Sequence, residues 1–510
     1  MSKAIVVGSG LAGLTTAAYL AKAGCAVTVY EQGEAIGGVT RTISRDGFSW
    51  DVGPLGIEGL YPNEPGGIVV SELGCAHRIP LVPMDRSVSF PGFRVFRPET
   101  YGGPAWRTDR LKEIFPDEAA AIDRFQQLIE TVTDLVALER RSAVTDGVLS
   151  ALLKLGLIAK FLPIKKYETW SAERLMNHYF KDPRLKAFFT GILADLVVKP
   201  SEFIGLGVGF FNMDCFMEGR TPSTKVFGVA PRLSYGIVTG GVKNLSGPIA
   251  ERVRELGGRI VTKMAVRRVL TEGDQAVGVE LTDGSRDGAD LVLVSGGAEE
   301  CFYDMIGRDR LPAEFTAAID TIRYMESVFM VQIGTGQNVT RHQDRPLVYY
   351  YNTYDIEATV QELRDGRYHE GKDGFLIFIN SMLSPDMAPK GKHSVTVYTV
   401  APNRLEGGWE DRREEMTGKL LDCAEREIPG LKQNADLIWS LTPDDFKKIV
   451  HTPRRHSFGG ICPVMGHPGA PHRTPYRGLW FIGSQSESGA GMLNQLVSAR
   501  KVAKMIARER

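Results

Sequence analysis

The sequence predicts an α/β fold in which three separated stretches of the chain share one parallel sheet, while two long insertions form a second, α+β domain. A strand, a glycine-rich turn, a helix and a second strand follow one another within residues 4–31. A helix and short strands fill residues 240–294 and end in a continuous apolar run. A strand, a glycine-rich loop and a helix occupy residues 478–507. Such alternation is typical of a parallel sheet flanked by helices.

The first stretch carries the most specific pattern. A buried strand is expected at Ala4–Val7, followed by the turn GSGLAG and a helix to about Ala23. Gly8 permits the tight turn, Gly10 lets the backbone approach a pyrophosphate, and Gly13 allows the helix to pack closely on the strand. The N–H groups at the start of that helix favour phosphates. The pattern therefore predicts a dinucleotide site.

An acid follows at the expected distance. The second strand, Ala26–Tyr30, ends at Glu31, about 20 residues beyond the glycines. A carboxylate there accepts from ribose hydroxyls and repels a 2′-phosphate.

A second glycine pair, Gly37-Gly38, comes shortly afterwards and is followed by residues 47–54, GFSWDVGP. Together these segments resemble the second pyrophosphate-contacting region of the FAD-binding amine oxidase and phytoene desaturase superfamily. That family usually has arginine directly after the glycine pair. Here the position is Val39, so Arg41 is the candidate for a charge-assisted phosphate contact.

The resemblance implies FAD as the cofactor and extends to the two later stretches. In the middle block Val266 matches the valine that contacts the adenine in that family. In the last block a helix from about Met492 follows the loop at 484–491 and stabilises negative charge on a reduced flavin. The candidate cofactor-binding residues are Gly8, Gly10, Leu11, Ala12, Gly13, Glu31, Gln32, Gly37, Gly38, Arg41, Thr42, Gly53, Pro54, Val266, Gly483, Gly491 and Met492.

These blocks define the expected domains. A discontinuous, Rossmann-like FAD-binding domain takes residues 1–84, 236–300 and 451–510. The substrate domain takes residues 85–235 and 301–450. We expect helices within about 117–200, at 117–138, 147–162, 171–179 and 183–196. Strand-like runs at 327–333, 374–380 and 394–400 predict an antiparallel sheet.

One helical stretch, Val148–Tyr167, is apolar on most sides, and its only charges are lysines. Fifteen residues up to Pro163 span roughly 22 Å, short of a bilayer core of about 30 Å, so no membrane crossing is expected. Two interpretations remain equally open. The helix lies in a membrane interface, with its lysines at the head groups, or it packs inside the helical insertion or at a homodimer contact.

Composition restricts the classes of partner. Lys+Arg and Asp+Glu are equal at 61 each, so no overall field attracts nucleic acid. The six cysteines are scattered without a CxxC pair, and no metal site is expected. This cysteine usage and a first strand at residue 4 predict a cytoplasmic protein. The apolar helix adds the alternative that the protein is attached peripherally to a membrane.

A flavin exchanges hydride with carbon without an obvious acid–base pair from the protein. Our candidate catalytic residue is Glu487, where the family's desaturases commonly have His-Pro; the alternative is that it caps the last helix. The resemblance implies an oxidoreductase that desaturates, saturates or isomerises carbon–carbon bonds of a hydrophobic isoprenoid- or polyene-like small molecule. The alternatives are a flavin amine oxidase acting on a C–N bond and a non-catalytic, flavin-binding lipid carrier.

Overall fold

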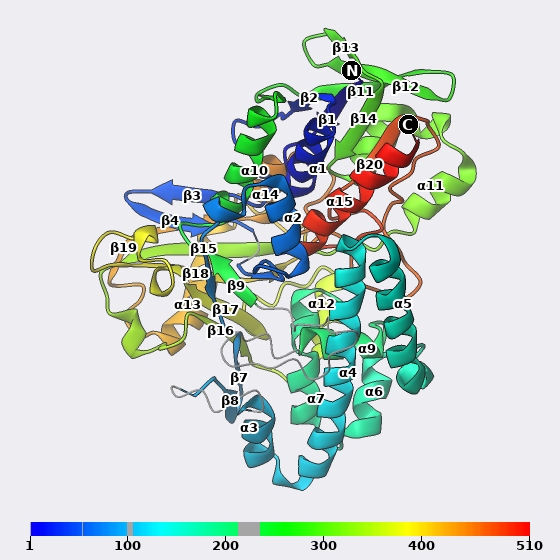
Figure 1. Cartoon of the computed structure of the whole chain (residues 1–510). Coiled ribbons are helices and arrows are strands. Elements are labelled where there is room, and N and C mark those ends of the chain that lie inside the picture. The colour runs from blue at the N-terminus through cyan, green and yellow to red at the C-terminus, as the bar shows by residue number, and fades with distance from the viewer. Residues whose placement is uncertain (1, 54, 99–105, 213–234, 510) are drawn as a thin grey trace.

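The computed structural model describes residues 2–53, 55–98, 106–212 and 235–509. Its nucleotide-side sheet is parallel and has the order β10-β2-β1-β14-β20 (Figure 1). The strands are β1 (Lys3–Val7), β2 (Ala26–Tyr30), β10 (Arg259–Val261), β14 (Leu291–Ser295) and β20 (Leu479–Ile482). Residue Ala4 pairs with Val27 on one side and with Leu291 on the other. Three separated stretches of chain thus build one sheet, as the α/β prediction states.

The two faces of this sheet are covered differently because side chains alternate along each strand. Ala4 and Val6 of β1 pack in one core with α1 (Leu11–Lys22), α2 (Pro65–Leu73), α10 (Lys243–Glu255) and α15 (Met492–Glu509). Ile5 and Val7 face a second core. That core includes β11 (Val266–Glu272) and β12 (Gln275–Leu281), the π-helical turn Glu300–Gly307 and α11 (Ala313–Asp320); β13 (Arg286–Gly288) completes the antiparallel sheet beside β12.

The insertions form a seven-stranded sheet of order β19-β15-β18-β17-β16-β7-β8. Its strands are β7 (Ser87–Phe90), β8 (Phe93–Val95), β15 (Ser327–Thr335), β16 (Leu347–Tyr351), β17 (Gly374–Ile379), β18 (His393–Ala401) and β19 (Ala435–Leu441). The predicted antiparallel arrangement needs one correction, since β16 and β7 run parallel. This pairing joins the first insertion to the second, and nothing local in the sequence specifies it.

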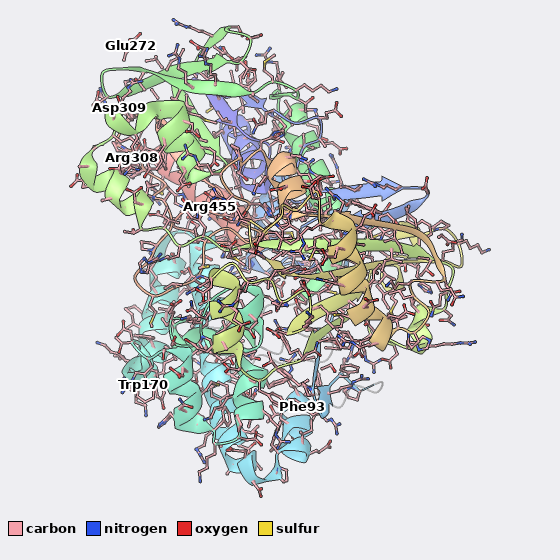
Figure 2. All side chains as sticks on the ribbon, turned by 180° about the vertical axis from the view of Figure 1, so that it is seen from behind. Phe93, Trp170, Glu272, Arg308, Asp309 and Arg455 are labelled. Atoms are coloured by element: carbon pink, nitrogen blue, oxygen red, sulfur yellow. The ribbon has the colours of Figure 1, made fainter. Side chains whose placement is uncertain are left out.

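The first insertion also supplies a helical layer next to this sheet (Figure 1). It comprises α3 (Trp106–Ile114), α4 (Ala119–Val144), α5 (Gly147–Phe161), α6 (Ala172–Tyr179), α7 (Pro183–Thr190), α8 (Ile192–Asp195) and α9 (Gly205–Phe211). Seen from behind, Trp170 lies in this helical layer and Phe93 lies on the strand at the sheet's far edge (Figure 2). The predicted helix at 183–196 is divided into α7 and α8.

The helical segment that carries the apolar stretch continues beyond residue 162, where the sequence predicts its end. Pro163 does not end it, because it occupies the first turn of a 3₁₀ segment, Leu162–Tyr167, that continues from α5. Gly147–Tyr167 is therefore long and apolar enough to cross a membrane by length and composition. The helix nevertheless packs against α4 through Leu153 and Leu157.

The remaining elements complete the fold. They are β3 (Thr42–Arg45), β4 (Phe48–Asp51), β5 (Ile57–Glu58), β6 (Leu81–Pro83), β9 (Tyr235–Val238), α12 (Ile356–Arg364), α13 (Arg413–Glu427) and α14 (Pro443–Val450). Among them, α13 packs on the seven-stranded sheet.

Candidate functional site

A cavity of about 210 Å³ lies where the strands of the parallel sheet end. Val7, Tyr30 and Val294 line it from the carboxyl ends of β1, β2 and β14, and Gly483 directly follows β20. This edge is where open α/β sheets bind nucleotides. Of the seventeen residues predicted from the sequence, eleven line this cavity: Gly8, Gly10, Leu11, Ala12, Glu31, Gln32, Gly37, Gly38, Arg41, Val266 and Gly483.

The glycines of the first turn are required by close backbone packing. Gly8 has a φ of 93°, and a Cβ there would overlap the carbonyl oxygen of Ser295 at the end of β14. A Cβ at Gly13 would overlap the Gly8 carbonyl, although Gly13 itself does not line the cavity. Gly10 precedes α1 and makes no side-chain cap, so the first N–H groups of α1 are available to a phosphate.

Glu31 holds this loop in place. Its Oε2 accepts from the Ser9 N–H at 2.9 Å and from the Ser9 hydroxyl at 2.6 Å, and its Oε1 accepts from the Gly33 N–H at 2.8 Å. The residue is only 7% exposed. A carboxylate has about four lone-pair sites, so capacity for a ribose hydroxyl remains on Oε1.

The second glycine pair lies against the first turn. Gly10 and Gly37 form an isolated parallel bridge, and a Cβ at Gly38 would contact the Gly10 Cα at 3.4 Å. Arg41 donates Nε–H to the Gly38 carbonyl at 2.6 Å and reaches the carbonyls of Ala35 and Ile449. Burial lowers the pKa of Arg41, but the usual value is so high that the guanidinium remains charged. The charge borders the cavity, where a pyrophosphate would meet it.

Other predicted residues lie outside the cavity lining and hold neighbouring segments in place. The Thr42 hydroxyl donates to Asp51 Oδ1 at 2.7 Å, and the same oxygen accepts from the Val242 N–H at 2.9 Å. These bonds tie the motif to the start of α10. A Cβ at Gly53 would overlap the Val39 carbonyl. Thr42 and Gly53 lie outside the cavity lining, and Pro54 lies outside the described residues.

The C-terminal segment differs most from expectation. Gly491 and Met492 do not line the cavity; Met492 is 5% exposed in the core beside α1. Glu487, our candidate catalytic residue, is also absent from the lining. Its carboxylate lies 3.8 Å from His472 Nε2 and 3.6 Å from Lys501 Nζ, an ion-pair position at the surface. Glu487 therefore does not border the cavity that the predicted glycines form, because the loop leaves the lining after Gln485.

The structure adds residues that sequence reasoning missed. Ser295 ends β14, Gly296 and Gly297 follow it, and three further segments contribute Glu300, Thr452, His456, Ser457 and Gln495. A glycine pair directly after a buried parallel strand, Gly296-Gly297, was the available signal.

Five of these side chains have a buried polar atom without a hydrogen-bond partner among the described residues: Glu300 Oε1, Thr452 Oγ1, His456 Nε2, Ser457 Oγ and Gln495 Oε1. Unpaired buried polar atoms cost free energy. Their concentration around one cavity fits a large polar cofactor.

The sheet, the glycine cradle and the acid at Glu31 define a dinucleotide-binding protein of the FAD type. The sequence profile of flavin-containing amine oxidoreductases matches residues 11–506, and the chain belongs to this family. FAD is its cofactor, and it is an FAD-dependent oxidoreductase.

The chain is 24% identical over 518 residues to the all-trans-retinol 13,14-reductase of Danio rerio, covering 94% of this chain and 82% of that one. It is 24% identical over 525 residues to the lycopene-forming phytoene desaturase of a Paracoccus species, covering 99% and 97%. A putrescine oxidase structure with bound putrescine superimposes with a TM-score of 0.63 at 16% identity, covering 99% of each chain, and shows the shared fold.

Proposed function

We propose that this oxidoreductase desaturates, saturates or isomerises carbon–carbon bonds of a hydrophobic, isoprenoid- or polyene-like molecule. The observation that carries the proposal is the likeness to a phytoene desaturase and a retinol reductase over more than nine-tenths of the chain. Both names denote reactions at carbon–carbon bonds of polyenes, in opposite redox directions. FAD supplies a ring that accepts or returns hydride.

The residues of the chain provide binding and orientation in this proposal. Gly10 and the start of α1 receive the phosphates, Arg41 adds a positive charge, and Glu31 orients the ribose. The seven-stranded sheet and the helical layer carry a shared core of aromatic and aliphatic side chains, including Phe188, Phe189 and Tyr349. The proposal places the apolar substrate beside this packed core, where apolar contacts are available.

We further propose that α5 attaches the enzyme to a lipid surface. Of the nine large apolar side chains exposed among the described residues, six belong to Gly147–Tyr167: Val148, Leu149, Leu152, Leu155, Ile158 and Leu162. Lys154, Lys165 and Lys166 are exposed beside them. Lys160 instead turns inward to Asp134 at 2.5 Å. An apolar face edged by lysines suits the interface of an anionic membrane, which is where a polyene would be stored.

The packing of α5 along α4 favours a position of α5 in the plane of the membrane surface over a position across the bilayer. Lys160 is fixed by an acid that is 2% exposed, and α5 runs beside α4 for its whole length in Figure 1. A crossing helix would have to break this contact and strand a buried carboxylate.

Anaerobic titration of the FAD-loaded enzyme with polyenes tests the proposed function. A polyene with a single bond that the enzyme desaturates should bleach the oxidised flavin. A polyene with a double bond that the enzyme saturates should reoxidise the reduced flavin. In both cases mass spectrometry should show a product that differs from the substrate by two daltons. An isomerase gives a product of equal mass and altered retention. Peroxide release with amines would establish the C–N alternative. Flavin that no donor reduces would indicate the lipid carrier.

A further inference from the structure

His456 is a buried histidine at the cofactor cavity that no motif in the sequence indicated. It follows α14 and is 2% exposed. Its ring stacks on Phe446 at a centroid separation of 4.7 Å and an angle of 10°. Its backbone N–H donates to Asn403 Oδ1 at 2.8 Å. Ring and backbone are therefore both held in place.

The partner of its Nδ1 determines which nitrogen carries the proton. Nδ1 lies 2.9 Å from the hydroxyl oxygen of Ser327 at the start of β15, and Ser327 is fully buried. This nitrogen is the one acceptor that the described residues offer to the Ser327 hydroxyl. We therefore assign the Ser327 hydroxyl as the donor to Nδ1, which leaves the proton of the neutral ring on Nε2.

The ring is also uncharged. Burial lowers the pKa of His456 to about 3, and the nearby Lys447 ammonium acts in the same direction. Lys447 itself is bound to the Asn403 carbonyl and to Asp444. His456 is thus a neutral donor throughout the physiological pH range, and its Nε2 has no partner among the described residues.

The position along the cavity indicates which half of the cofactor this donor meets. Four residues earlier, Thr452 approaches Gly297, and His451 Nε2 approaches Gly33 beside Glu31, which is the adenosine end. Two residues later, the Phe458 ring lies 5.9 Å from Tyr398 on β18 of the substrate domain. Arg455, the neighbour of His456, lies at the junction of the two domains (Figure 2).

We propose that His456, oriented by Ser327, donates its Nε2–H to an acceptor atom of the flavin half of FAD. An uncharged donor satisfies an oxygen or nitrogen of the flavin mononucleotide portion without adding positive charge beside Arg41. Ser327 is a positioning residue, because it selects the tautomer without contacting the cofactor.

The test compares the binding of FAD with that of ADP, which lacks the flavin half. We expect His456→Phe to weaken FAD binding about tenfold, as for loss of one hydrogen bond to a buried acceptor, while ADP affinity stays unchanged. The flavin absorbance spectrum of the bound cofactor should shift as well. His456→Gln retains an N–H donor and should bind FAD more tightly than His456→Phe. Ser327→Ala should bind FAD more weakly than the wild type, because nothing then holds the His456 proton on Nε2.

A second serine–histidine pair provides the matched control. His393 on β18 lies 3.1 Å from the Ser381 hydroxyl through Nδ1 but does not line the cavity. His393→Phe should leave the affinity for FAD and the spectrum unchanged. The apoprotein of each variant is checked for folding by circular dichroism. Unchanged FAD affinity in a folded His456→Phe variant, or an equal loss for FAD and ADP, would overturn the proposal.

Discussion

Glu31 shows how a single acid prepares the nucleotide loop before the cofactor arrives. Three donors from Ser9 and Gly33 converge on its two oxygens. Because backbone N–H groups cannot rotate away, the carboxylate fixes the loop in the conformation that exposes the start of α1. The same residue therefore acts on the ribose directly and on the phosphates through the loop.

Replacing this acid by its amide should weaken cofactor binding. In Glu31→Gln the amide NH₂ must face one of the donors, so the loop loses one bond and gains a donor–donor conflict. We expect FAD to bind about 5- to 150-fold more weakly, since such a loss costs roughly 1–3 kcal/mol. Fluorescence titration of the apoprotein measures it. Glu34→Gln, at a residue whose side chain is 81% exposed, is the control; an equal loss there would contradict the role of Glu31.

Asp51 should make the folded protein less stable as the pH rises, the opposite of the effect of a carboxyl whose pKa is lowered by folding. Burial raises the pKa of Asp51 to about 6, despite the bonds from Thr42 and Val242. The folded chain therefore binds more protons than the unfolded chain between about pH 4 and 6, and this carboxyl destabilises the fold as pH rises through that window. Relative to Asp51→Asn, the wild type should lose about 3 kcal/mol between pH 4 and 7. Urea unfolding of both proteins at each pH checks this; a constant difference would contradict it.

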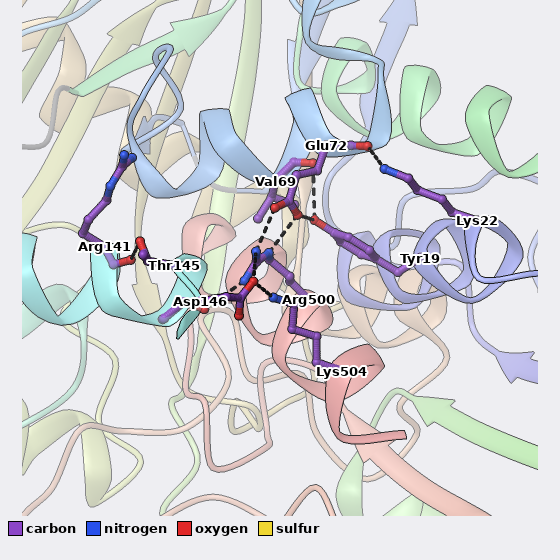
Figure 3. A network of polar contacts seen from close by, with 10 residues as sticks. Tyr19, Lys22, Val69, Glu72, Arg141, Thr145, Asp146, Arg500 and Lys504 are labelled. Atoms are coloured by element: carbon purple, nitrogen blue, oxygen red, sulfur yellow. Dashed lines mark hydrogen bonds and ion pairs between the residues drawn. The ribbon is translucent and has the colours of Figure 1, made fainter. Parts of the chain in front are cut away.

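At the scale of elements, the last helix is joined to the rest of the protein by a buried arginine. Arg500 of α15 forms a bidentate pair with Glu72 of α2 at 2.7 and 2.8 Å and reaches Asp146 before α5 (Figure 3). Tyr19 of α1 donates to the same Glu72 at 2.6 Å. One network thus connects elements from four distant parts of the chain.

Arg500→Met should destabilise the fold. The arginine side chain is 4% exposed, whereas Glu72 is 33% exposed and partly screened by solvent. Loss of the pair should therefore cost about 2–3 kcal/mol, measured by urea unfolding of the FAD-loaded protein. The control is Arg473→Met, which removes an exposed pair with Glu509 of the same helix and should be nearly neutral. Similar losses of unfolding free energy in both variants would show that the burial of Arg500 is not the cause of its contribution to stability.

The exposed face of α5 should control lipid binding. Leu155 and Ile158 are 60% and 56% exposed. Introducing glutamate at both positions removes apolar contact and adds repulsion from anionic head groups, so affinity for phosphatidylglycerol vesicles should fall about 100-fold. Co-sedimentation measures binding. Stability should change by less than about 0.5 kcal/mol, because neither side chain is in the core.

Ile438→Glu provides the comparison, since Ile438 is an exposed apolar residue on β19, which lies on the opposite side of the molecule from α5 in Figure 1. It should sediment like the wild type. A wild-type protein that does not bind vesicles, and elutes as a dimer that the double variant disrupts, would assign this face to a homodimer contact.

At the scale of the whole molecule, the cofactor cavity depends on segments that only the native fold brings together. Its walls come from residues 7–41, 266–305, 449–458 and 483–495. A ligand that binds only this state stabilises it by mass action, by about 2.7 kcal/mol at a hundredfold excess over Kd.

FAD should therefore raise the melting temperature of the apoprotein in proportion to the logarithm of its concentration. ADP should stabilise less at an equal concentration, because it contacts fewer of these segments. Thermal melting monitored by circular dichroism tests both expectations. A melting temperature that is the same in the presence and absence of saturating FAD would contradict the assembly of this site by folding.

The sequence was most informative where structure is local. The position of Glu31 follows from a strand, a turn and a helix of ordinary length, and α4 and α6 follow from the spacing of apolar residues. The pairing of β7 with β16 was missed, because it joins residues more than 250 positions apart. Thr42 was assigned to the cofactor, but its hydroxyl is taken by Asp51; side-chain direction is not a property of spacing.

The sequence by itself determined the α/β class and a dinucleotide site, because glycine turns and strand ends are fixed by backbone sterics over a few residues, and its resemblance to the flavoprotein family implied FAD as the cofactor. Only the tertiary structure decided which side chains meet the cavity. Glu487 lies beside His472, outside the cavity lining. His456 lines the cavity, although it comes from a segment without a motif. The physical reason is that buried polar partners are selected by packing between distant segments, and packing is settled when the whole chain has folded.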